Sequence, residues 1–430
     1  MKKALALILA LVMVLALAAC GGKSGDSSEG GAASGDEGSS STETLTIFNS
    51  KMEIQSQMEE MAEKYSQEKG IPVEVYYSSD TVAAHMATRY ASNDPYALAM
   101  VDAKDVYSLG AEHAVDLSGE QWVGDTTQAI SVDGKVLGFP VCVEARGIIY
   151  NADAIKNVTG SDFDPSSIRT TADFQALVDE LIAGGMATPT GVMKEDWSLA
   201  AHFLAETYEL HDDPDAFIAG IKDGSISLAD DEVYNALMDT FDVLKNNNYA
   251  KDSAISAERE LTEQKLAEGE IAFMFGGNWD WDVINAYDYT ENMGMMPVPS
   301  ALDGYNTKLV GGGSKYFYVD NGVSEELQQA AKDFLNWLVY EADGQDFLVN
   351  QCNLVPAFSN ITLEVSNPLG ASVKAFADKG DLVPNYNYAP DDHYAKCGAS
   401  FQKYLAGQID RAGLAEEVTA YWATAEVGAH

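Results

Sequence analysis

The chain has 430 residues and a formal net charge of −41, from 67 acidic and 26 basic side chains. Such a strongly acidic surface argues against nucleic acid and anionic lipid as binding partners. The length is sufficient for two or three compact lobes.

The N-terminus predicts an exported protein that carries a lipid. Lys2 and Lys3 precede an uncharged apolar run over 4–19, which is too short for a comfortable membrane span and has the flanks of a signal peptide. The letters LAAC at 17–20 match the bacterial lipobox, in which cleavage occurs before the cysteine and its thiol carries the lipid. We therefore expect a lipoprotein signal peptide over 1–19 and lipidation of Cys20. The alternative is an ordinary secretory signal with an incidental cysteine.

Residues 20–44 are expected to form the lipidated cysteine and a flexible tether. They are rich in Gly, Ser and acidic residues, and none after the cysteine is apolar and larger than Ala. Such a segment cannot bury enough apolar surface to become ordered. No later apolar run approaches the length of a membrane span. We therefore expect an extracytoplasmic body, anchored by its lipid to the outer face of the bacterial cell membrane.

The folded body begins with alternating strands and helices. Apolar strands are expected at 45–48, 71–77 and 97–101, with an amphipathic helix after the first and a weaker helix after the second. Gly70 is expected to end the first helix. Its apolar stripe consists of Ile54, Met58, Met61 and Tyr65. Strand–helix–strand order predicts parallel strands with right-handed crossovers, and thus an α/β sheet with helices on its faces.

Polar residues follow each of these strands. In α/β sheets the ligand crevice lies beyond the carboxyl ends of the strands. The candidates at those ends are Asn49, Lys51, Asp80 and Asp102. The alternative is that each caps a helix, because Ser, Asp and Asn are favoured at that position, and Asp80 is the clearest cap candidate.

The stretch over 133–151, DGKVLGFPVCVEARGIIYN, combines apolar runs with one charged pair. Glu144 and Arg146 lie between the runs, and strand alternation puts both side chains on the same face. An unpaired buried charge costs several kcal/mol, so a buried strand would not keep this pair without a purpose. Either the pair is solvated on an edge strand, or Glu144 contacts a ligand. Arg146 either contacts the ligand as well or only forms an ion pair with Glu144.

The later part of the chain is predicted to be mainly helical. Thr171 and Ser324 are expected to cap two of the helices, and Gly184 to end the first of them. Trp197 lies in what reads as a polar loop, KEDWS, and either packs against the next helix or is available to a ligand. A glycine run at 310–314 is expected to precede a strand at 316–319.

The segment over 271–282 is predicted to run from a strand through two glycines into a helix start. Such a turn lets backbone and an aromatic side chain approach a ligand closely, which makes Trp279 a candidate. The segment lacks the G-K-[ST] ending of a phosphate loop. Asp280 is a second candidate, although an acidic residue here could simply stabilise the N-terminus of the helix.

The cysteine and histidine patterns do not indicate a metal site. Cys142, Cys352 and Cys397 remain besides Cys20, and none has C-x-x-C spacing. The six histidines show no H-E-x-x-H or H-x-H pattern. We expect no metal, no cofactor and at most one disulfide, whose partners stay open.

Taken in order, four segments resemble the extracellular solute-binding proteins of carbohydrate ABC importers, the family 1 branch that includes maltose-binding protein. They are the stretch at 133–151, GEIAFMFGGNWDWDVIN at 269–285, the glycine run with its following strand and long helix at 311–348, and the closing VPN followed by helices. The resemblance implies a two-lobed, type II periplasmic-binding-protein-like α/β fold, with mixed sheets, helices on both faces and crossover hinge strands. The implied lobes are 45–143 with 311–356, and 144–310 with 357–430.

The resemblance also implies roles for individual residues. Glu144 falls where the family places a carboxylate on sugar hydroxyls, and Trp279 where an aromatic stacks on a pyranose ring. Lys51 and Asn49 stand where the family has polar contacts. His393 stands where maltose-binding protein has another aromatic. No aromatic residue occupies the position near Asp102 that maltose binders use, so maltose itself is not implied.

The expected function is therefore non-enzymatic: a monomer that captures a sugar or oligosaccharide by hinge closure and delivers it to the permease subunits of an ABC transporter. One alternative in the same fold is a polyamine or other cation, which Trp279, Asp280 and Glu144 could bind through cation–π contacts and ion pairs. A less favoured alternative is a secreted glycoside hydrolase with paired carboxylates. The sequence does not specify which sugar, its length, its linkage or which permease is the partner.

Overall fold

A computed structural model describes residues 43–426. The predicted signal peptide, the lipidation of Cys20 and nearly all of the tether therefore lie outside the described residues. Residues Thr42–His430 form one compact unit. Within the described range, none of the helices is both long enough and apolar enough to cross a membrane.

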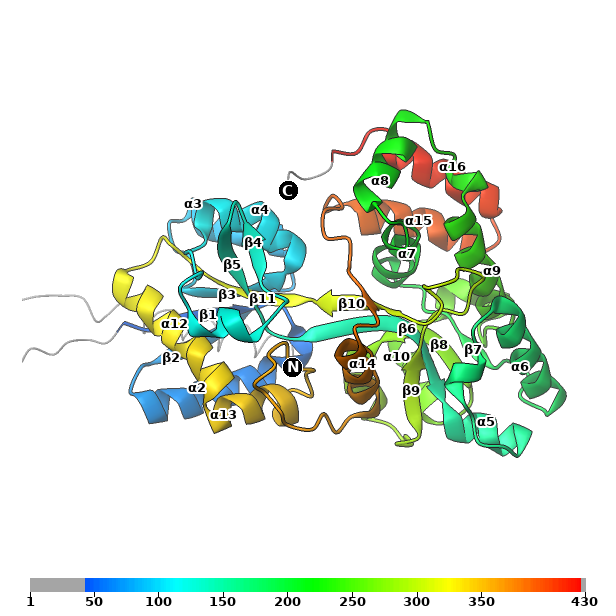
Figure 1. The fold of residues 1–430 in the computed structure, drawn as a ribbon, viewed down its shortest axis with the longest axis horizontal. Coiled ribbons are helices and arrows are strands. Elements are labelled where there is room, and N and C mark those ends of the chain that lie inside the picture. Colours follow the sequence, from blue (N-terminus) through cyan, green and yellow to red (C-terminus); the bar gives the residue numbers. More distant parts are fainter. Residues whose placement is uncertain (1–42, 427–430) are drawn as a thin grey trace, which may run out of the picture. The chain divides into compact units, whose positions relative to one another are not determined.

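The first sheet has six strands in the order β2-β1-β3-β11-β5-β4 (Figure 1). Strand β1 pairs in parallel with β2 and β3, which confirms the predicted strand–helix–strand units. Strand β11 returns antiparallel between β3 and β5, so the sheet is mixed. The strands are β1 Leu45–Asn49, β2 Val73–Tyr77, β3 Leu98–Asp102, β4 Ile130–Val132, β5 Lys135–Pro140 and β11 Lys315–Val319.

The second sheet is built around the long strand β6. It has the order β12-β10-β6-β8-β7, and β9 also pairs with β6. Strands β8, β9 and β10 all run antiparallel to β6. The strands are β6 Val143–Asn151, β7 Thr190–Gly191, β8 Phe273–Gly277, β9 Met293–Met296, β10 Leu309–Gly313 and β12 Leu382–Val383.

Two short connections carry the chain between the sheets. Residues 141–142 join β5 to β6, and Ser314 joins β10 to β11. The chain also comes close to the first crossover at a third place, where Val143 and Val355 form an isolated β-bridge. Both segments that resembled hinge strands therefore do pass from one sheet to the other. The lobe boundaries proposed at 143/144, 310/311 and 356/357 stay a prediction, because no observation fixes where one lobe ends.

The glycine run at 310–314 was expected to precede a strand, which it does, and it also forms a strand itself. Most of it is β10, with Gly311 opposite Ala145 of β6. A Cβ atom on Gly311 would lie 2.3 Å from the Glu144 carbonyl oxygen and 2.5 Å from Ala145 Cβ. Glycine stands here because the two crossover strands approach too closely for a side chain, and not because the segment turns.

Amphipathic helices cover the first sheet. They are α2 Gln55–Lys69, α3 Val82–Ala91, α4 Ala103–His113, α12 Glu325–Tyr340 and α13 Ala342–Asp346. The predicted stripe on α2 is buried, and its last member, Tyr65, packs edge-on against Phe334 and Trp337 of α12. Gly70 ends α2 in the left-handed conformation, at φ 73°, as predicted. The Ser324 side chain caps α12 as expected, by accepting a hydrogen bond from the Leu327 amide.

Helices also surround the second sheet. They are α5 Ala152–Thr159, α6 Thr171–Ala183, α7 Ala205–Glu209, α8 Pro214–Asp223, α9 Glu232–Asn246, α10 Arg259–Ala267, α11 Trp281–Ile284, α14 Pro368–Lys379, α15 His393–Leu405 and α16 Arg411–Trp422, with the π-helix η4 Trp197–Leu204 and the short 3-10 helix η7 Asn278–Asp280.

Three local predictions need correction. Thr170, not Thr171, caps α6, because its hydroxyl accepts from the Asp173 amide while the Asp173 carboxylate accepts in return. Thr81, not Asp80, caps α3, through the Ala84 amide. Trp197 does not lie in a loop, since it is the first residue of η4.

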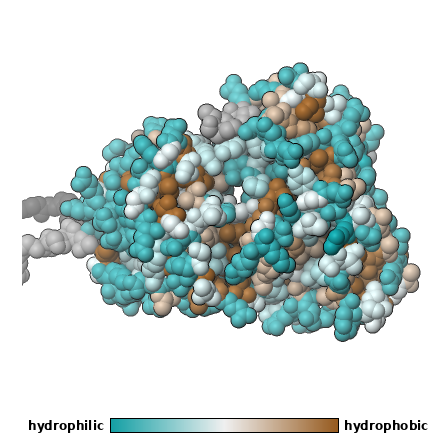
Figure 2. All heavy atoms as spheres, in the orientation of Figure 1, coloured by the Kyte–Doolittle hydropathy of each residue, from teal (hydrophilic) through white to brown (hydrophobic). Residues whose placement is uncertain are grey.

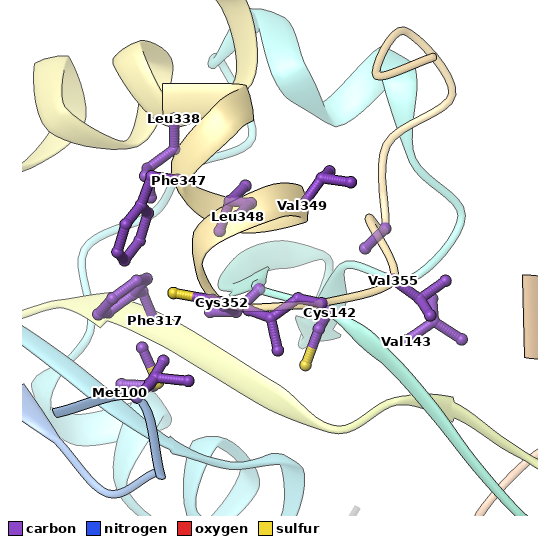
Figure 3. Close-up of a cluster of buried hydrophobic side chains, with 14 of the residues drawn as sticks. Met100, Cys142, Val143, Phe317, Leu338, Phe347, Leu348, Val349, Cys352 and Val355 are labelled. Atoms are coloured by element: carbon purple, nitrogen blue, oxygen red, sulfur yellow. The ribbon is translucent and has the colours of Figure 1, made fainter. Parts of the chain in front are cut away.

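The three described cysteines are free and buried. Cys142 and Cys352 lie in one cluster of apolar side chains beside the first crossover, together with Val143, Val355, Leu348 and others (Figure 3). Burial raises the pKa of the Cys142 thiol to about 12. At neutral pH the group is therefore an uncharged packing residue. On the face shown in Figure 2, hydrophilic residues predominate and hydrophobic ones are scattered in small groups.

Candidate functional site

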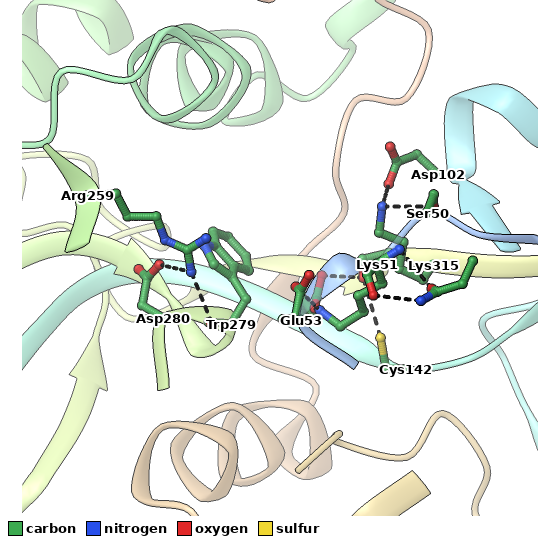
Figure 4. A network of polar contacts seen from close by, with 12 residues as sticks. Ser50, Lys51, Glu53, Asp102, Cys142, Arg259, Trp279, Asp280 and Lys315 are labelled. Atoms are coloured by element: carbon green, nitrogen blue, oxygen red, sulfur yellow. Dashed lines mark hydrogen bonds and ion pairs between the residues drawn. The ribbon is translucent and has the colours of Figure 1, made fainter. Parts of the chain in front are cut away.

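The crossover region holds a buried ion pair between the first strand and the first crossover. Lys51 follows β1, and its Nζ donates to Glu144 Oε1 at 2.8 Å and to Glu53 Oε1 at 2.7 Å (Figure 4). The Ser314 hydroxyl donates to the other Glu144 oxygen. Glu144 therefore ties both crossovers to the end of β1.

The charged groups of this cluster stabilise one another in their ionised forms. Burial by itself lowers the pKa of Lys51, but the Glu144 and Glu53 carboxylates outweigh it and leave that pKa well above its ordinary value. Burial raises the pKa of Glu53, yet Lys51 outweighs this effect and brings the pKa to about 2. Both groups are consequently ionised at neutral pH.

Asn49 shapes the turn that presents Lys51. Its Oδ1 accepts from the Lys51 amide at 2.8 Å, and its Nδ2 donates to the Lys51 carbonyl and to Gln55 Oε1, both at 2.9 Å. Asn49 itself is fully buried. With its amide engaged in this way, Asn49 positions the site, and Lys51 is the residue of the pair that reaches the first crossover, at Glu144.

Asp102 joins the same region, while Asp80 does not. Lys315, the first residue of β11, donates to the half-exposed Asp102 carboxylate and approaches Ser50 Oγ at 3.4 Å (Figure 4). Asp80 is exposed at the start of α3, and its amide donates to Ser78 Oγ. The structure therefore brings Asn49, Lys51, Asp102 and Glu144 together and leaves Asp80 apart.

On the second sheet, Trp279 is placed by the glycines that precede it. A Cβ on Gly277 would lie 2.3 Å from carbons of the Trp279 ring, so only glycine lets the indole fold back against the end of β8. The ring contacts the His202 imidazole at a centroid distance of 4.7 Å. His202 in turn meets Trp197 edge-on at 5.3 Å. The two candidate tryptophans thus belong to one aromatic surface, joined by a histidine that the sequence did not single out.

Arg259 supports this surface from α10. Its guanidinium lies over the Trp197 ring at 5.7 Å and donates to the Trp279 carbonyl at 3.4 Å. It also pairs with Glu263 at 2.8 Å and Asp280 at 3.3 Å. Asp280 accepts from the Gly277 amide as well. The carboxylate of Asp280 therefore stabilises the start of the helix, as the alternative for this residue proposed, and it also pairs with Arg259.

Arg259, Glu263 and Asp280 form a buried trio, and burial favours one proton on its two carboxyl groups. Burial and the Asp280 carboxylate raise the pKa of Glu263 strongly, although Arg259 opposes them. Burial also raises the pKa of Asp280. At neutral pH one arginine, one carboxylate and one carboxylic acid result, and their charges cancel.

A second trio of the same kind surrounds Arg146. Its guanidinium bonds to Glu209, donates to Asn385 Oδ1 at 2.7 Å, and lies 3.5 Å from Glu206 Oε1. Burial raises the pKa of Glu206 to about 8, with Arg146 opposing and Glu209 adding to the shift. The idea that Arg146 only pairs with Glu144 is therefore wrong. Residues two apart on a strand are separated by about 6.6 Å, and each of these side chains has a nearer partner.

The two sides of the site influence each other. Asp282 follows Trp281, and burial raises its pKa to about 6, while Lys51 lowers it and Glu53 and Glu144 raise it. Arg259 likewise interacts with Glu53. Asp282 and Arg259 therefore lie within electrostatic reach of Lys51 and Glu53, and Figure 4 shows Trp279, Asp280 and Arg259 on one side and Lys51 and Glu53 on the other along the crossover strands.

His393 lies elsewhere. It is buried in an aromatic cluster, 3.2 Å from the Tyr208 hydroxyl and 5.3 Å in ring centroids from Trp422. Burial lowers the pKa of its imidazole to about 4. The structure does not bring it next to Trp279 or Lys51, and its role as a ligand contact stays a prediction.

Sequence reasoning missed several residues of this site: Glu53, His202, Arg259, Glu263, Ser314 and Lys315. Arg259 and Glu263 carried a weak signal, the i, i+4 spacing of an ion pair on a helix. His202 carried none, because its place between two tryptophans depends on a π-helix. Among residues 43–426 no group of three or more His, Cys, Asp or Glu side chains could hold a metal ion.

The family model for bacterial extracellular solute-binding proteins matches residues 60–377, across both sheets and the crossovers. The chain belongs to this family. The family consists of extracellular binding proteins and not of enzymes.

Individual solute-binding proteins resemble the chain over most of its length. A maltooligosaccharide ABC transporter solute-binding lipoprotein of Streptococcus pneumoniae serotype 4 is 26% identical over 83% of this chain and 81% of its own. The maltodextrin-binding protein MdxE of Bacillus subtilis is 24% identical over 89% and 85%. A solved structure, the solute-binding protein RafE in complex with raffinose, matches with a TM-score of 0.74 at 18% identity, over 89% of this chain and 99% of that one. The structural match confirms the two-lobed fold.

Proposed function

We propose that the protein captures an uncharged oligosaccharide between its two lobes and delivers it to the permease subunits of an ABC importer. A sugar offers an apolar C–H face to an aromatic surface and a ring of hydroxyls to polar groups. The observation that carries the proposal is the aromatic surface of Trp197, His202 and Trp279 opposite the polar cluster of Lys51 and Glu53. The relatives named above, which bind maltooligosaccharides, maltodextrin and raffinose, support the same class.

The charge of the second-lobe surface favours a neutral ligand over a polyamine. Each of the two arginines, Arg146 and Arg259, has two buried carboxyl groups that retain one proton between them, so neither trio offers net negative charge. Arg259 already holds the cationic position over the Trp197 ring. A second cation over the Trp197 ring would meet like charge, which weakens the cation–π contact available to a polyamine there.

The carboxyl groups also argue against glycoside hydrolysis. A hydrolase needs one carboxyl group as a proton donor and a second that is free to act as base or nucleophile. Both oxygens of Glu144 are engaged, by Lys51 and Ser314. Asp280 and Glu263 are buried against Arg259 behind Trp279. The site therefore suits binding without chemistry.

Thermal unfolding of residues 42–430 with a panel of ligands tests this proposal. The panel contains maltotriose, raffinose, stachyose, a chitin oligosaccharide and spermidine. We expect at least one sugar to raise the melting temperature, because a ligand of the native state alone stabilises it, and spermidine to have no effect. Trp279→Ala should abolish the shift. A shift with spermidine and with no sugar would overturn the proposal.

We further infer that Cys20 carries the lipid, since the Streptococcus pneumoniae relative is named as a lipoprotein and the lipobox is at the expected place. Expression of the whole chain with a labelled fatty acid tests this. The native chain should take up label and remain with the membrane fraction, whereas Cys20→Ser should do neither. Equal labelling of both chains would exclude this anchor.

A further inference from the structure

His202 lies between Trp197 and Trp279 in the aromatic surface. It lies on η4, an eight-residue π-helix, and such segments occur frequently at functional sites. Its ring is within 4.7 Å of Trp279 and 5.3 Å of Trp197, measured between centroids. Nothing in the proposed mode of sugar stacking requires a histidine here, because a third apolar ring would pack equally well.

The surroundings keep this imidazole uncharged. Burial lowers its pKa well below the ordinary value, and the guanidinium groups of Arg146 on β6 and Arg259 on α10 add to the effect. The carboxyl groups near these arginines, on α7, α10 and η7, are engaged with the arginines: Glu206, Glu209, Glu263 and Asp280. His202 is therefore neutral throughout the physiological pH range.

The two ring nitrogens differ in environment. Nδ1 is buried and has no hydrogen-bond partner. Nε2 is not among the buried unpartnered atoms, and within residues 43–426 no hydrogen bond engages it, so it is the nitrogen that retains some exposure in this half-buried ring. A buried N–H without a partner is rarer and costlier than a buried lone pair. The proton therefore belongs on Nε2, which presents a donor.

We propose that His202 is a specificity-determining residue of the ligand site, whose Nε2–H donates to a hydroxyl oxygen of an uncharged sugar stacked on Trp279. The inference rests on the proposed function and extends it to a residue and an atom. A fixed neutral donor beside two arginines selects for an oxygen acceptor and against an ammonium group. A sugar analogue that lacks the hydroxyl in contact with His202 should bind more weakly by the same factor as the loss of the imidazole.

Two substitutions separate hydrogen bonding from packing. His202→Phe keeps a ring between the tryptophans but removes the donor, whereas His202→Gln keeps an N–H donor. The control is His113→Phe, the same exchange in a half-buried histidine that stacks on Tyr90 at 3.6 Å on the first lobe. Each protein, with residues 42–430, is titrated by calorimetry with maltotriose, raffinose and stachyose, and its melting temperature is measured without ligand.

We expect His202→Phe to weaken binding about tenfold, as for one neutral hydrogen bond, while His202→Gln recovers part of the loss and His113→Phe has no effect. The affinity of the native protein should be constant between pH 5 and 8, because the donor does not titrate there. The 15N shifts of His202 should report the Nε2–H tautomer over the same range.

The outcomes that overturn the proposal are distinct from those that overturn the function. If a sugar binds and His202→Phe binds it equally well, the role of His202 is wrong and the sugar-binding function stands. A loss of affinity below pH 6.5, or an Nδ1–H tautomer, would contradict the neutral donor. If no sugar binds the native protein, the proposed function and the role of His202 both fail.

Discussion

Lys51 has 2% of its side chain exposed and depends on Glu144 and Glu53 for compensation of its charge. Taking one partner out of such a buried pair leaves the other uncompensated, which typically costs about 3–5 kcal/mol. We expect Lys51→Met to lower the free energy of unfolding by about 3 kcal/mol in urea titrations. The double variant with Glu144→Gln should recover much of that loss.

A matched exposed pair serves as the control for this prediction. Lys64 lies 2.9 Å from Asp343 with about half of each side chain exposed. Exposed pairs contribute about 0–1 kcal/mol, so Lys64→Met should change stability little. Equal losses from Lys51→Met and Lys64→Met would show that the crossover pair contributes no more than a surface ion pair.

The raised pKa of Glu206 predicts that the stability of the fold depends on pH in an unusual way. Its pKa is raised to about 8 in the folded protein, from an ordinary value of 4.5. A carboxyl group with a raised pKa stabilises the fold fully below its unfolded pKa, and this contribution is lost as the pH rises through the folded value. The stability that Glu206 contributes should therefore decline between about pH 4.5 and 8.

The comparison with Glu206→Gln isolates this effect. The uncharged amide should match the native protein at pH 5 and exceed it by a few kcal/mol at pH 9, in denaturant unfolding followed at both pH values. Glu180→Gln, an exposed position on α6, should show no such trend. A difference between Glu206→Gln and the native protein that does not change with pH would mean that Glu206 is ionised in the fold.

At the level of elements, the pairing of β6 with β10 controls how the two crossovers run side by side. Gly311 has backbone atoms of β6 within 2.3–2.6 Å of the place where a Cβ would be, whereas Gly312 has only the end of the Gln128 side chain, at 3.3 Å. Backbone cannot move aside as a flexible side chain can. We expect Gly311→Ala to destabilise the protein by about 2 kcal/mol or more and Gly312→Ala by less than about 1 kcal/mol, in thermal or urea unfolding. Equal effects would contradict the close approach of the strands.

The same strands show how far sequence reasoning reached. The apolar period of α2 and the strand–helix–strand order predicted the parallel strands β2, β1 and β3 of the first sheet correctly, because these signals are local. Periodicity gave no sign that the glycine run at 310–314 forms a strand, since glycine in a turn and glycine in a crowded strand look the same in sequence. Arg146 was assigned the wrong partner because Glu206 and Glu209 lie about sixty positions later in the chain. Long-range pairings of this kind leave no periodic signal.

The candidate site was predictable to a similar degree. Glu144 and Trp279 could be named because each belongs to a segment with a recognisable family pattern, and Lys51 because it follows the first strand. The partners that hold them, Ser314 and Arg259, come from distant elements, and nothing in the sequence pointed to these pairings. His202 depends on the wide turn of a π-helix, which hydrophobic periodicity does not predict.

In the molecule as a whole, a further contact links the two sheets besides the crossovers. The segment 384–392, between β12 and α15, is fixed to the second lobe by Asn385, which binds Arg146, and by the Tyr386 amide, which donates to Glu209. Its other end reaches α4 of the first lobe. Lys104 forms an ion pair with Asp391, and Tyr107 packs against Tyr388 at 4.8 Å between ring centroids.

This contact should favour the conformation in which the lobes are joined across the site. The apparent affinity for a ligand falls with the fraction of molecules in the competent conformation. An exposed ion pair and an aromatic pair together contribute about 1–2 kcal/mol, so the double variant Lys104→Ala/Tyr107→Ala should weaken sugar binding by roughly tenfold. Its unliganded radius of gyration in small-angle X-ray scattering should increase, while saturating sugar restores the native value.

Lys403→Ala, which breaks an ion pair with Glu417 inside the second lobe, should leave both quantities unchanged. If the double variant kept the native radius and affinity, closure would be determined by the crossovers and the ligand alone.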